Sequence, residues 1–422
     1  MPKKRIFKYC IICILTAASV FCFYTWHNQV LETEKQKLQT IIEHNKSALQ
    51  YEKNKLEYAN KLVNDYQKLE ARSRYSEDKI KAYLLKNEHT EKNTPLFNIN
   101  NIVQIETHDD IKEKRKNIIN YIWKNKEFPH NLQPNKVEEN YADKVYIQNE
   151  NIENVTRLTF NMEHGVNSYV YFYKNKQPQN CLAIYHRGHG SDYHFYQAAE
   201  PVTNDFLNLG CDTLLISMPL LGVNNQPEIN IKHLGPITLK THNDFAFLEN
   251  ESFSPISYFM TPIAGSINYA NQHHNYNKIV MAGLSGGGWS TVLYSALDER
   301  IQKSYSIAGS MPIYIRNSQN ESGDYEQLLP SLYKIANYLE LYIMTTSNNR
   351  SHIQVVNRFD DCCFSGTAFK TYIDFVANKA LSMGGRYFLM LDETLIRHGV
   401  SQQARKLLKQ DIQNTFNPQN TL

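Results

Sequence analysis

The hydrophobic positions of this 422-residue chain follow three successive patterns. Residues 9–26 are an unbroken apolar run, residues 31–66 carry apolar side chains at seven-residue intervals, and short apolar runs separated by turn residues fill the chain beyond residue 145. These patterns predict a membrane-length helix, a long helix with one apolar seam, and buried β-strands, respectively. We therefore expect an anchored stalk that carries one globular domain.

Residues 1–27 are interpreted as a cytoplasmic tail and a transmembrane anchor. The apolar run from Tyr9 to Trp26 has no charge and would span about 27 Å as a helix, close to the roughly 30 Å core of a bilayer. Its end is bulky, whereas small residues precede a signal-peptide cleavage site, so we favour an uncleaved anchor over a cleaved signal. The basic residues before the run predict that the N-terminus stays in the cytoplasm and that the domain lies outside it.

Residues 28–92 are expected to form a helical stalk, because no glycine or proline interrupts them. The apolar side chains at seven-residue intervals predict a coiled coil, which could join copies of the chain into a homo-oligomer. Asn45 and Glu52 interrupt the seam, so a single solvated amphipathic helix is the alternative. One heptad position is filled by Ile42, Leu49, Leu56 and Val63.

The junction between stalk and domain is placed at residues 93–106, which break the helical pattern and are interpreted as a linker. Thr107 and Asp110 have the spacing of a capping box, and this predicts a helix that runs from there to near Pro129. The globular domain is accordingly assigned to residues 107–422.

Charge and composition exclude several classes of function. Residues 31–422 carry 41 basic and 42 acidic side chains, whereas nucleic-acid binding needs a marked excess of Lys and Arg. We therefore predict no nucleic-acid partner. A hydrophobic content of 42% and an aromatic content of 12% exclude wholesale disorder.

Eight short apolar runs predict the strands of one sheet. Residues 155–160 and 168–173 are typical of an antiparallel pair, and the six later runs are continuous, as in buried parallel strands. Because helical stretches lie between most of them, we predict an open, mostly parallel α/β sheet with helices on both faces. Such sheets bind ligands at the carboxyl ends of their strands. The six later runs are residues 181–186, 211–218, 278–283, 303–309, 352–357 and 386–391.

A Gly-x-Ser-x-Gly motif follows the run at 278–283. It reads Gly283-Leu284-Ser285-Gly286-Gly287 and leads into a helix-capable segment. A serine on such a strand–turn–helix corner exposes its hydroxyl at the sheet edge, so Ser285 is the candidate nucleophile.

A serine hydroxyl needs a base to activate it, and the base needs a carboxylate to orient it. His398 lies on the loop after the last predicted strand and is the candidate base. Asp360, just after the run at 352–357, is the preferred acid; its neighbour Asp361 is the alternative, and Asp392 is a weaker third.

The oxyanion formed by attack on an acyl carbon needs two N–H donors. We expect one from the backbone of Gly286 and the other from His189 or Gly188, in the segment His186-Arg187-Gly188-His189-Gly190. The two histidines of that segment have no third ligand at a suitable spacing, so no metal site is predicted.

With these motifs, residues 107–422 resemble the α/β-hydrolase superfamily, and its serine esterases in particular. The chain order Ser285, Asp360, His398 agrees with the family's pattern, while Arg187 stands where a glycine is expected. The resemblance implies hydrolysis of carboxylic esters through an acyl-enzyme without a cofactor. A peptidase or amidase on the same fold, and an inactive binding module on a coiled-coil scaffold, are the alternatives.

The predicted topology fits a bacterial inner-membrane protein whose domain faces the periplasm, or a eukaryotic single-pass protein whose domain faces the lumen. The abundance of Lys, Asn, Ile and Tyr favours an AT-rich bacterium, and the location suggests a small-molecule or envelope-polymer ester as substrate. The region 229–277 is longer than a simple connection and is expected to help form the substrate pocket or its lid. His242 and Asp244 within it are weaker catalytic candidates.

Two pairs of cysteines could form disulfides in an oxidising compartment. Cys181 and Cys211 open neighbouring predicted strands, and we expect two buried thiols there, with a disulfide as the alternative. Cys362 and Cys363 are adjacent, and since a bond between them would be strained, free thiols are expected there as well.

Overall fold

The computed structural model describes the chain from residue 98 to 416 with five gaps, at residues 142–148, 190–200, 317–322, 361 and 396. Its contacts define two units, Met1–Arg74 with Gln419–Leu422, and Tyr75–Pro418. Of the predicted anchor and stalk only residues 27, 28, 31, 32 and 35 are described, and these are helical; the other anchor and stalk residues lie outside the described residues. Among described residues, no helix combines the length and apolarity that crossing a bilayer requires.

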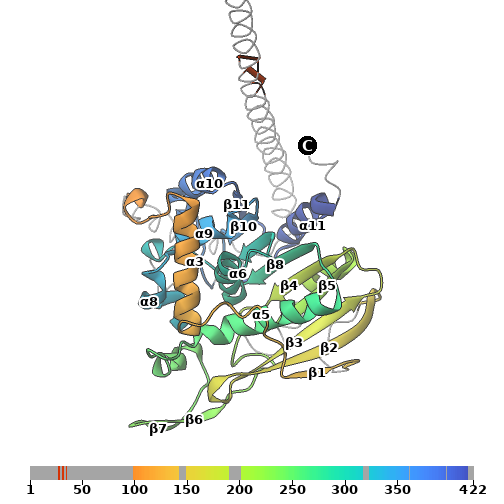
Figure 1. Ribbon diagram of the computed structural model, residues 1–422, viewed down its shortest axis with the longest axis vertical. Helices are drawn as coiled ribbons and strands as arrows, with labels where there is room; N and C mark the ends of the chain where they lie inside the picture. The colour runs from red at the N-terminus through yellow and green to blue at the C-terminus, as the bar shows by residue number, and fades with distance from the viewer. Residues whose placement is uncertain are drawn as a thin grey trace, which may run out of the picture. The chain divides into compact units, whose positions relative to one another are not determined.

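A nine-stranded sheet in the order β1-β2-β3-β5-β4-β8-β9-β10-β11 forms the centre of the second unit (Figure 1). The six strands from β5 to β11 are parallel, and antiparallel pairs join β1 to β2, β2 to β3 and β3 to β5. The predicted α/β class with a mostly parallel central sheet is confirmed. The strands are β1 (Lys136–Glu138), β2 (Ile152–Asn161), β3 (Asn167–Asn175), β4 (Cys181–His186), β5 (Cys211–Ile216), β8 (Lys278–Leu284), β9 (Lys303–Ile307), β10 (Ser351–Asn357) and β11 (Arg386–Asp392).

All eight predicted strands are present, but the predicted eight-stranded sheet is wrong by one strand. The additional strand β1 has only three residues, two of them exposed, so the sequence has no apolar run that predicts it. A separate two-stranded ribbon, β6 (Glu228–Ile231) with β7 (Gly235–Thr238), was also missed. Both ribbon strands are four residues long and only partly buried, which leaves no clear hydrophobic pattern.

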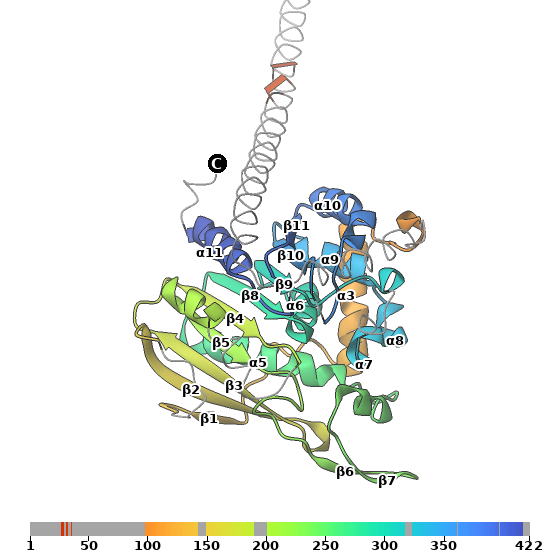
Figure 2. The same cartoon turned by 180° about the vertical axis from the view of Figure 1, so that it is seen from behind.

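Helices cover both faces of the sheet (Figure 1; Figure 2). Side chains of β4 alternate between two hydrophobic clusters: Leu182 and Ile184 pack on one face, Ala183 and Tyr185 on the other. The helix at 201–208 and α11 cover the second face. The helices on the first face are α3 (His108–Trp123), α5 (Ile256–His273), α6 (Gly286–Leu297), α9 (Tyr338–Thr346) and α10 (Ile373–Ser382); α11 is Gln402–Phe416.

The start of the domain differs from the predicted boundary. Val103 and Ile105 are buried in the core, so the second half of the predicted linker belongs to the folded domain. The capping box of Thr107 and Asp110 is confirmed, since each side chain accepts the other residue's backbone N–H. The helix ends at Trp123, several residues before Pro129, because Lys124 adopts the left-handed conformation.

Cys181 and Cys211 form a disulfide, which corrects the expectation of two thiols. The two residues are the first of β4 and β5 and lie directly opposite each other in the parallel register, with their Cα atoms 4.6 Å apart. The bond therefore joins the two strands at their amino ends, away from the edge where ligands bind.

His352 on β10 is a buried, neutral histidine. Its Nδ1 lies 2.7 Å from Ser304 Oγ and its Nε2 lies 3.0 Å from Ser306 Oγ. Burial lowers the pKa of His352 to about 3. The unfolded chain therefore binds a proton here between about pH 6.5 and pH 3 while the folded chain does not.

Because the unfolded state binds more protons, the free energy of unfolding should fall as the pH drops below about 6.5. The contribution of His352 is up to about 1.4 kcal/mol per pH unit. Urea unfolding between pH 7 and pH 4 measures this slope. A His352→Asn variant, although less stable at pH 7, should show a shallower slope, and an unchanged slope would contradict the assignment.

Candidate active site

Ser285 occupies the corner between β8 and α6. Its backbone has φ 58° and ψ −128°, a left-handed conformation that non-glycine residues rarely adopt. Its N–H donates to Ile307 O at 2.9 Å, and its own carbonyl accepts the N–H of Trp289 at 3.0 Å, which starts the helix. Ser285 is partly exposed, whereas Leu284 and Gly286 are buried. The predicted elbow is thus present, and it directs one hydroxyl-bearing residue out of a buried segment.

The glycines around Ser285 allow this corner to form. A Cβ on Gly283 would lie 2.1 Å from Gly287 O, and a Cβ on Gly287 would lie 2.0 Å from His186 O. Both contacts are with backbone, which cannot move without shifting a strand. The corner therefore packs directly against the end of β4, which the Gly-x-Ser-x-Gly pattern alone did not specify.

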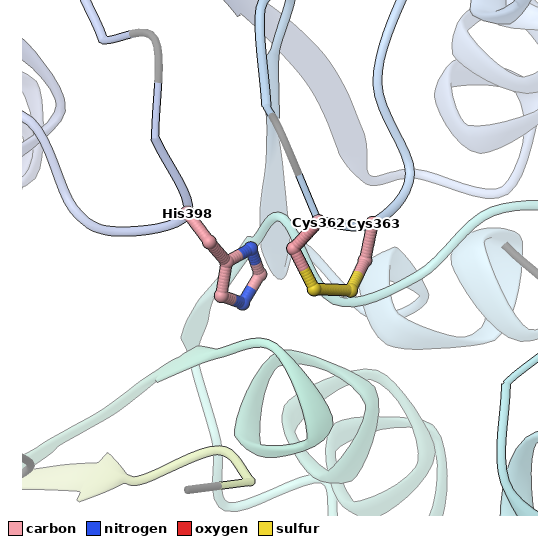
Figure 3. Close-up of side chains that lie close together, drawn as sticks. All are labelled: Cys362, Cys363 and His398. Carbon is pink, nitrogen blue, oxygen red and sulfur yellow. A yellow bond between two sulfur atoms is a disulfide. The ribbon is translucent and has the colours of Figure 1, made fainter. Parts of the chain in front are cut away.

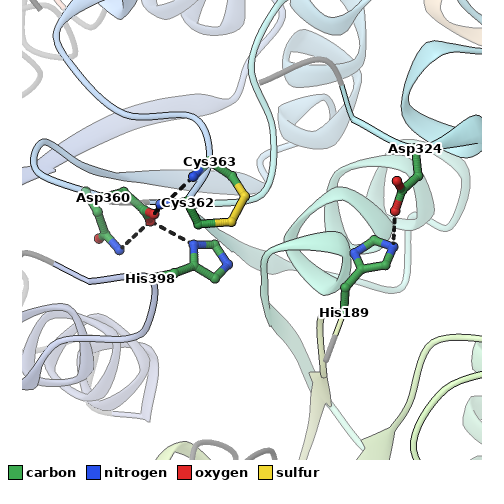
Figure 4. Close-up of a disulfide and its surroundings, with 7 residues drawn as sticks. His189, Asp324, Asp360, Cys362, Cys363 and His398 are labelled. Atoms are coloured by element: carbon green, nitrogen blue, oxygen red, sulfur yellow. Dashed lines mark hydrogen bonds and ion pairs between the residues drawn. A yellow bond between two sulfur atoms is a disulfide. The ribbon is translucent and has the colours of Figure 1, made fainter. Parts of the chain in front are cut away.

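His398 and Asp360 are brought together from the loops after β11 and β10. His398 Nδ1 lies 2.8 Å from Asp360 Oδ2 (Figure 4). The other oxygen, Oδ1, accepts the backbone N–H groups of Cys362 and Cys363 at 2.9 and 3.1 Å. The Asp360 side chain is fully buried and that of His398 is 20% exposed. Because β8, β10 and β11 are parallel, this pair and Ser285 lie at the same edge of the sheet.

The other acid candidates have different positions. Asp392 accepts hydrogen bonds from the backbone N–H of Thr394 at 2.9 Å and from the hydroxyl of Ser401, at the start of α11. Asp361 lies outside the described residues. Among the described acid candidates, Asp360 is the one whose carboxylate contacts His398.

The described part of the predicted oxyanion segment, residues 186–189, lies against the corner at Ser285. A Cβ on Gly188 would lie 2.5 Å from Ser285 Cβ and 3.3 Å from Gly286 N. A Cβ on Gly286 would lie 2.5 Å from His189 Cε1. Arg187 is buried, and its guanidinium donates to Ser217 Oγ at 3.2 Å. The three residues predicted as donors are therefore neighbours of the candidate nucleophile.

Four polar side chains converge next to Gly286, and no sequence pattern predicted this cluster. His189 follows β4, His242 begins the 3₁₀ helix η3 (His242–Phe247), and Asp324 and Glu326 flank Tyr325 at the start of α7 (Tyr325–Leu328). His189 Nε2 lies 2.8 Å from His242 Nδ1, 2.8 Å from Asp324 Oδ2 and 3.3 Å from Glu326 Oε1. His242 Nδ1 lies 3.2 Å from Glu326 Oε1.

The histidines and carboxylates of this cluster shift one another's pKa. Burial alone would lower the pKa of His189, but the carboxylates of Asp324 and Glu326 raise it to about 10. Burial would raise the pKa of Glu326, but His242 and His189 hold it well below its usual range. The cluster thus favours one positive charge beside its two carboxylates.

Region 229–277 supplies a helix cap, a covering helix and a residue next to His189. Asp244, a weaker catalytic candidate, accepts the N–H groups of Lys240 and Thr241 at 2.9 and 2.8 Å, and so caps η3. Helix α5 is an ordinary covering helix that packs on the sheet. His242 is the residue of this region that reaches the oxyanion segment, through His189.

Cys362 and Cys363 form a disulfide, which corrects the expectation of free thiols (Figure 3). The bond lies beside the imidazole of His398: the two sulfur atoms and a ring nitrogen of His398 are all within 4.8 Å of one another. The disulfide thus forms part of the wall next to the candidate base, while its backbone N–H groups hold Asp360.

The strand order, the corner at Ser285 and the contact between His398 and Asp360 agree with the resemblance to the α/β-hydrolase superfamily. No family model and no curated protein sequence matches the chain.

Solved structures with a similar fold include several esterases. Acetyl xylan esterase 1 from Thermoanaerobacterium sp. JW/SL YS485 is 15% identical, with a TM-score of 0.48 over 72% of this chain and 92% of that chain. An acetyl xylan esterase from Paenibacillus sp. R4 is 15% identical, with a TM-score of 0.47 over 77% of this chain and 98% of that one. Esterase Pf2001 from Pyrococcus furiosus is 14% identical, with a TM-score of 0.42 over 69% and 100%.

Proposed function

We propose that this chain is a serine hydrolase that cleaves carboxylic esters, with Ser285 as nucleophile, His398 as base and Asp360 as the acid that orients it. The observation that carries the proposal is the contact of 2.8 Å between His398 Nδ1 and Asp360 Oδ2, at the sheet edge where Ser285 occupies a left-handed corner. Nucleophile, base and acid in this chain order and on these loops are the arrangement that acyl transfer requires.

The reaction proceeds in two halves. Ser285 Oγ attacks the acyl carbon while His398 Nε2 takes the hydroxyl proton, and the developing oxyanion accepts N–H bonds from Gly286 and from the Gly188–His189 segment. The tetrahedral intermediate then expels the alcohol, which receives the proton from His398. Water deprotonated by the same nitrogen then attacks the acyl carbon; the bond to Ser285 Oγ breaks, the carboxylic acid leaves, and His398 returns the proton to Ser285 Oγ.

The test is a panel of p-nitrophenyl esters of increasing acyl length, with the matching p-nitroanilides as amides. An acyl-enzyme predicts release of p-nitrophenol in an initial burst close to one equivalent of enzyme, when deacylation is the slower step. Turnover of esters with little turnover of anilides supports esterase activity. A preference for anilides would point instead to an amidase, and well-folded protein that hydrolyses neither group would contradict the proposal.

We further propose that the domain lies outside the cytoplasm, tethered to a bacterial inner membrane by residues 9–26. The basic cluster before this apolar run supports that orientation. The Cys181–Cys211 disulfide is in keeping with an oxidising compartment. An acylated envelope polymer would be within reach of such an enzyme, and residues 28–92 could join two copies as a coiled coil.

A reporter enzyme that is active only outside the cytoplasm tests this orientation. Fused after residue 95 it should be active, whereas the control fusion after residue 8, ahead of the apolar run, should be inactive. The difference is expected because the apolar run directs the chain on its C-terminal side across the membrane. Activity of neither fusion, or of the residue 8 fusion alone, would contradict the proposed topology.

A further inference from the structure

We propose that His189, His242, Asp324 and Glu326 bind a divalent transition-metal ion of the zinc type next to the oxyanion segment. The site stands on the geometry of these four side chains, and it does not depend on the hydrolase activity proposed above. Their ligating atoms all lie within 4.8 Å of one another.

The cluster has fewer hydrogens than acceptor atoms, so hydrogen bonds alone cannot give each of its nitrogen and oxygen atoms a partner. His242 Nε2 lies 2.9 Å from Pro219 O and must donate its hydrogen there, so His242 Nδ1 presents a lone pair to the cluster. His189 Nε2 carries at most one hydrogen but faces three acceptors, namely His242 Nδ1, Asp324 Oδ2 and Glu326 Oε1. A divalent cation at the centre would displace the hydrogen of His189 Nε2, release it to solvent and accept all four lone pairs at once.

The spacing suits a tetrahedral ion. Bonds of about 2.0–2.1 Å place neighbouring ligand atoms of a tetrahedral site roughly 3.3 Å apart. Glu326 Oε1 already lies 3.3 Å from His189 Nε2 and 3.2 Å from His242 Nδ1. The two contacts of 2.8 Å that His189 makes with His242 and Asp324 need to open by about half an ångström.

The chemistry of the four ligands selects the type of ion. Two imidazole nitrogens and two carboxylate oxygens suit zinc and its neighbours in the first transition row. Calcium and magnesium prefer sites made of oxygen alone. Two carboxylates also neutralise a divalent charge, so the occupied site would carry no net charge in a partly buried place.

An independent observation at Glu326 points to the same ligand. This side chain is completely buried, yet its second oxygen, Oε2, has no hydrogen-bond partner among the described residues. Burying a carboxylate oxygen without a partner is costly, and a cation held by the same carboxylate would offset that cost.

The ion would hold the oxyanion segment in a fixed position. The ring of His189 packs against Gly286, the residue after the candidate nucleophile. Asp324 reaches this ring from the start of α7 (Figure 4). A metal bound to His189 would therefore fix the segment that carries Gly188 by tying it to η3 and α7, without touching the reacting atoms.

The test is metal binding by the full-length chain, stripped with a chelator and then dialysed against limiting Zn²⁺. Elemental analysis should find one zinc per chain, and Tm should rise on adding zinc. Asp324→Asn, whose side chain is 39% exposed and whose loss should not prevent folding, and Glu326→Gln should each weaken binding at least tenfold. Asp374→Asn, on the exposed first turn of α10, is the matched control and should bind as the wild type does.

Cobalt provides a second readout, because Co²⁺ in a four-coordinate site absorbs strongly in the visible range and this signal should be lost in Asp324→Asn. Ser285→Ala should bind zinc normally, which separates the metal site from the hydrolase proposal. Less than 0.1 equivalent of zinc bound to folded wild type, or equal binding by wild type and Asp324→Asn, would overturn the site.

Discussion

Replacing Ser285 with alanine should lower kcat/KM for the best ester of the panel by about 10⁴-fold or more, because Ser285 Oγ is the atom that the proposal assigns to the acyl-enzyme. The fold should persist, since alanine also has a Cβ and adds no strain to the left-handed corner beyond what serine already tolerates. The expected result is therefore loss of turnover with an unchanged free energy of unfolding, measured in urea to within about 1 kcal/mol.

A fluorophosphonate probe, which labels activated serines covalently, gives the same test without a known substrate. The wild type should be labelled and Ser285→Ala should not. Ser290→Ala is the matched control, because Ser290 lies within α6, is buried, and its hydroxyl donates to Met218 Sδ. Labelling of the Ser285→Ala variant would assign the nucleophile to a different residue, and an unlabelled, folded wild type would argue for a binding module.

The parts of the site that could be predicted from sequence are those encoded locally. The corner at Ser285 needs a strand, a tight turn and a helix within about 20 residues, and each leaves its own pattern. The contact between His398 and Asp360 could be expected because both residues follow a recognisable buried strand, and parallel strands end at one edge. The capping box at Thr107 was equally local.

The histidine–carboxylate cluster could not be predicted in this way. Its ligands come from three segments separated by 53 and 84 residues, and their meeting depends on how η3 and α7 pack over the oxyanion segment. In the sequence, the only histidine pair considered as metal ligands was His186 and His189. In the structure His186 Nδ1 contacts Arg187 O instead, and burial lowers the pKa of His186 to about 4. In the sequence, Asp324 and Glu326 resemble the acids that commonly occupy the N-cap and first turn of a helix.

The sequence led us to expect thiols at both cysteine pairs, whereas the structure has two disulfides. Cys181 and Cys211 could be placed on neighbouring strands, but only the register, which sets them directly opposite each other, brings the sulfur atoms together. Strand β1 and the ribbon of β6 and β7 were not predicted, because short, half-exposed strands carry little hydrophobic pattern.

Replacing Asp360 with asparagine should reduce kcat by about 10³–10⁴-fold through the wrong tautomer of His398. In the wild type, Asp360 Oδ1 accepts the N–H groups of Cys362 and Cys363 while Oδ2 accepts the hydrogen of His398 Nδ1. The asparagine carbonyl would keep the two backbone bonds, because an NH₂ group cannot accept them. Its NH₂ would then face His398 Nδ1 and require a lone pair there.

That arrangement moves the hydrogen of His398 to Nε2, the atom that must take the proton of Ser285, so the base is blocked although every side chain stays in place. Asp361→Asn is the matched control, because it makes the same chemical change at the neighbouring position, and its activity should stay within a few-fold of wild type. A large loss in Asp361→Asn with little change in Asp360→Asn would reverse the assignment. Because Asp392 is bound by Thr394 and Ser401, Asp392→Asn should lower stability more than kcat, so comparing the three variants isolates the carboxylate that orients the base.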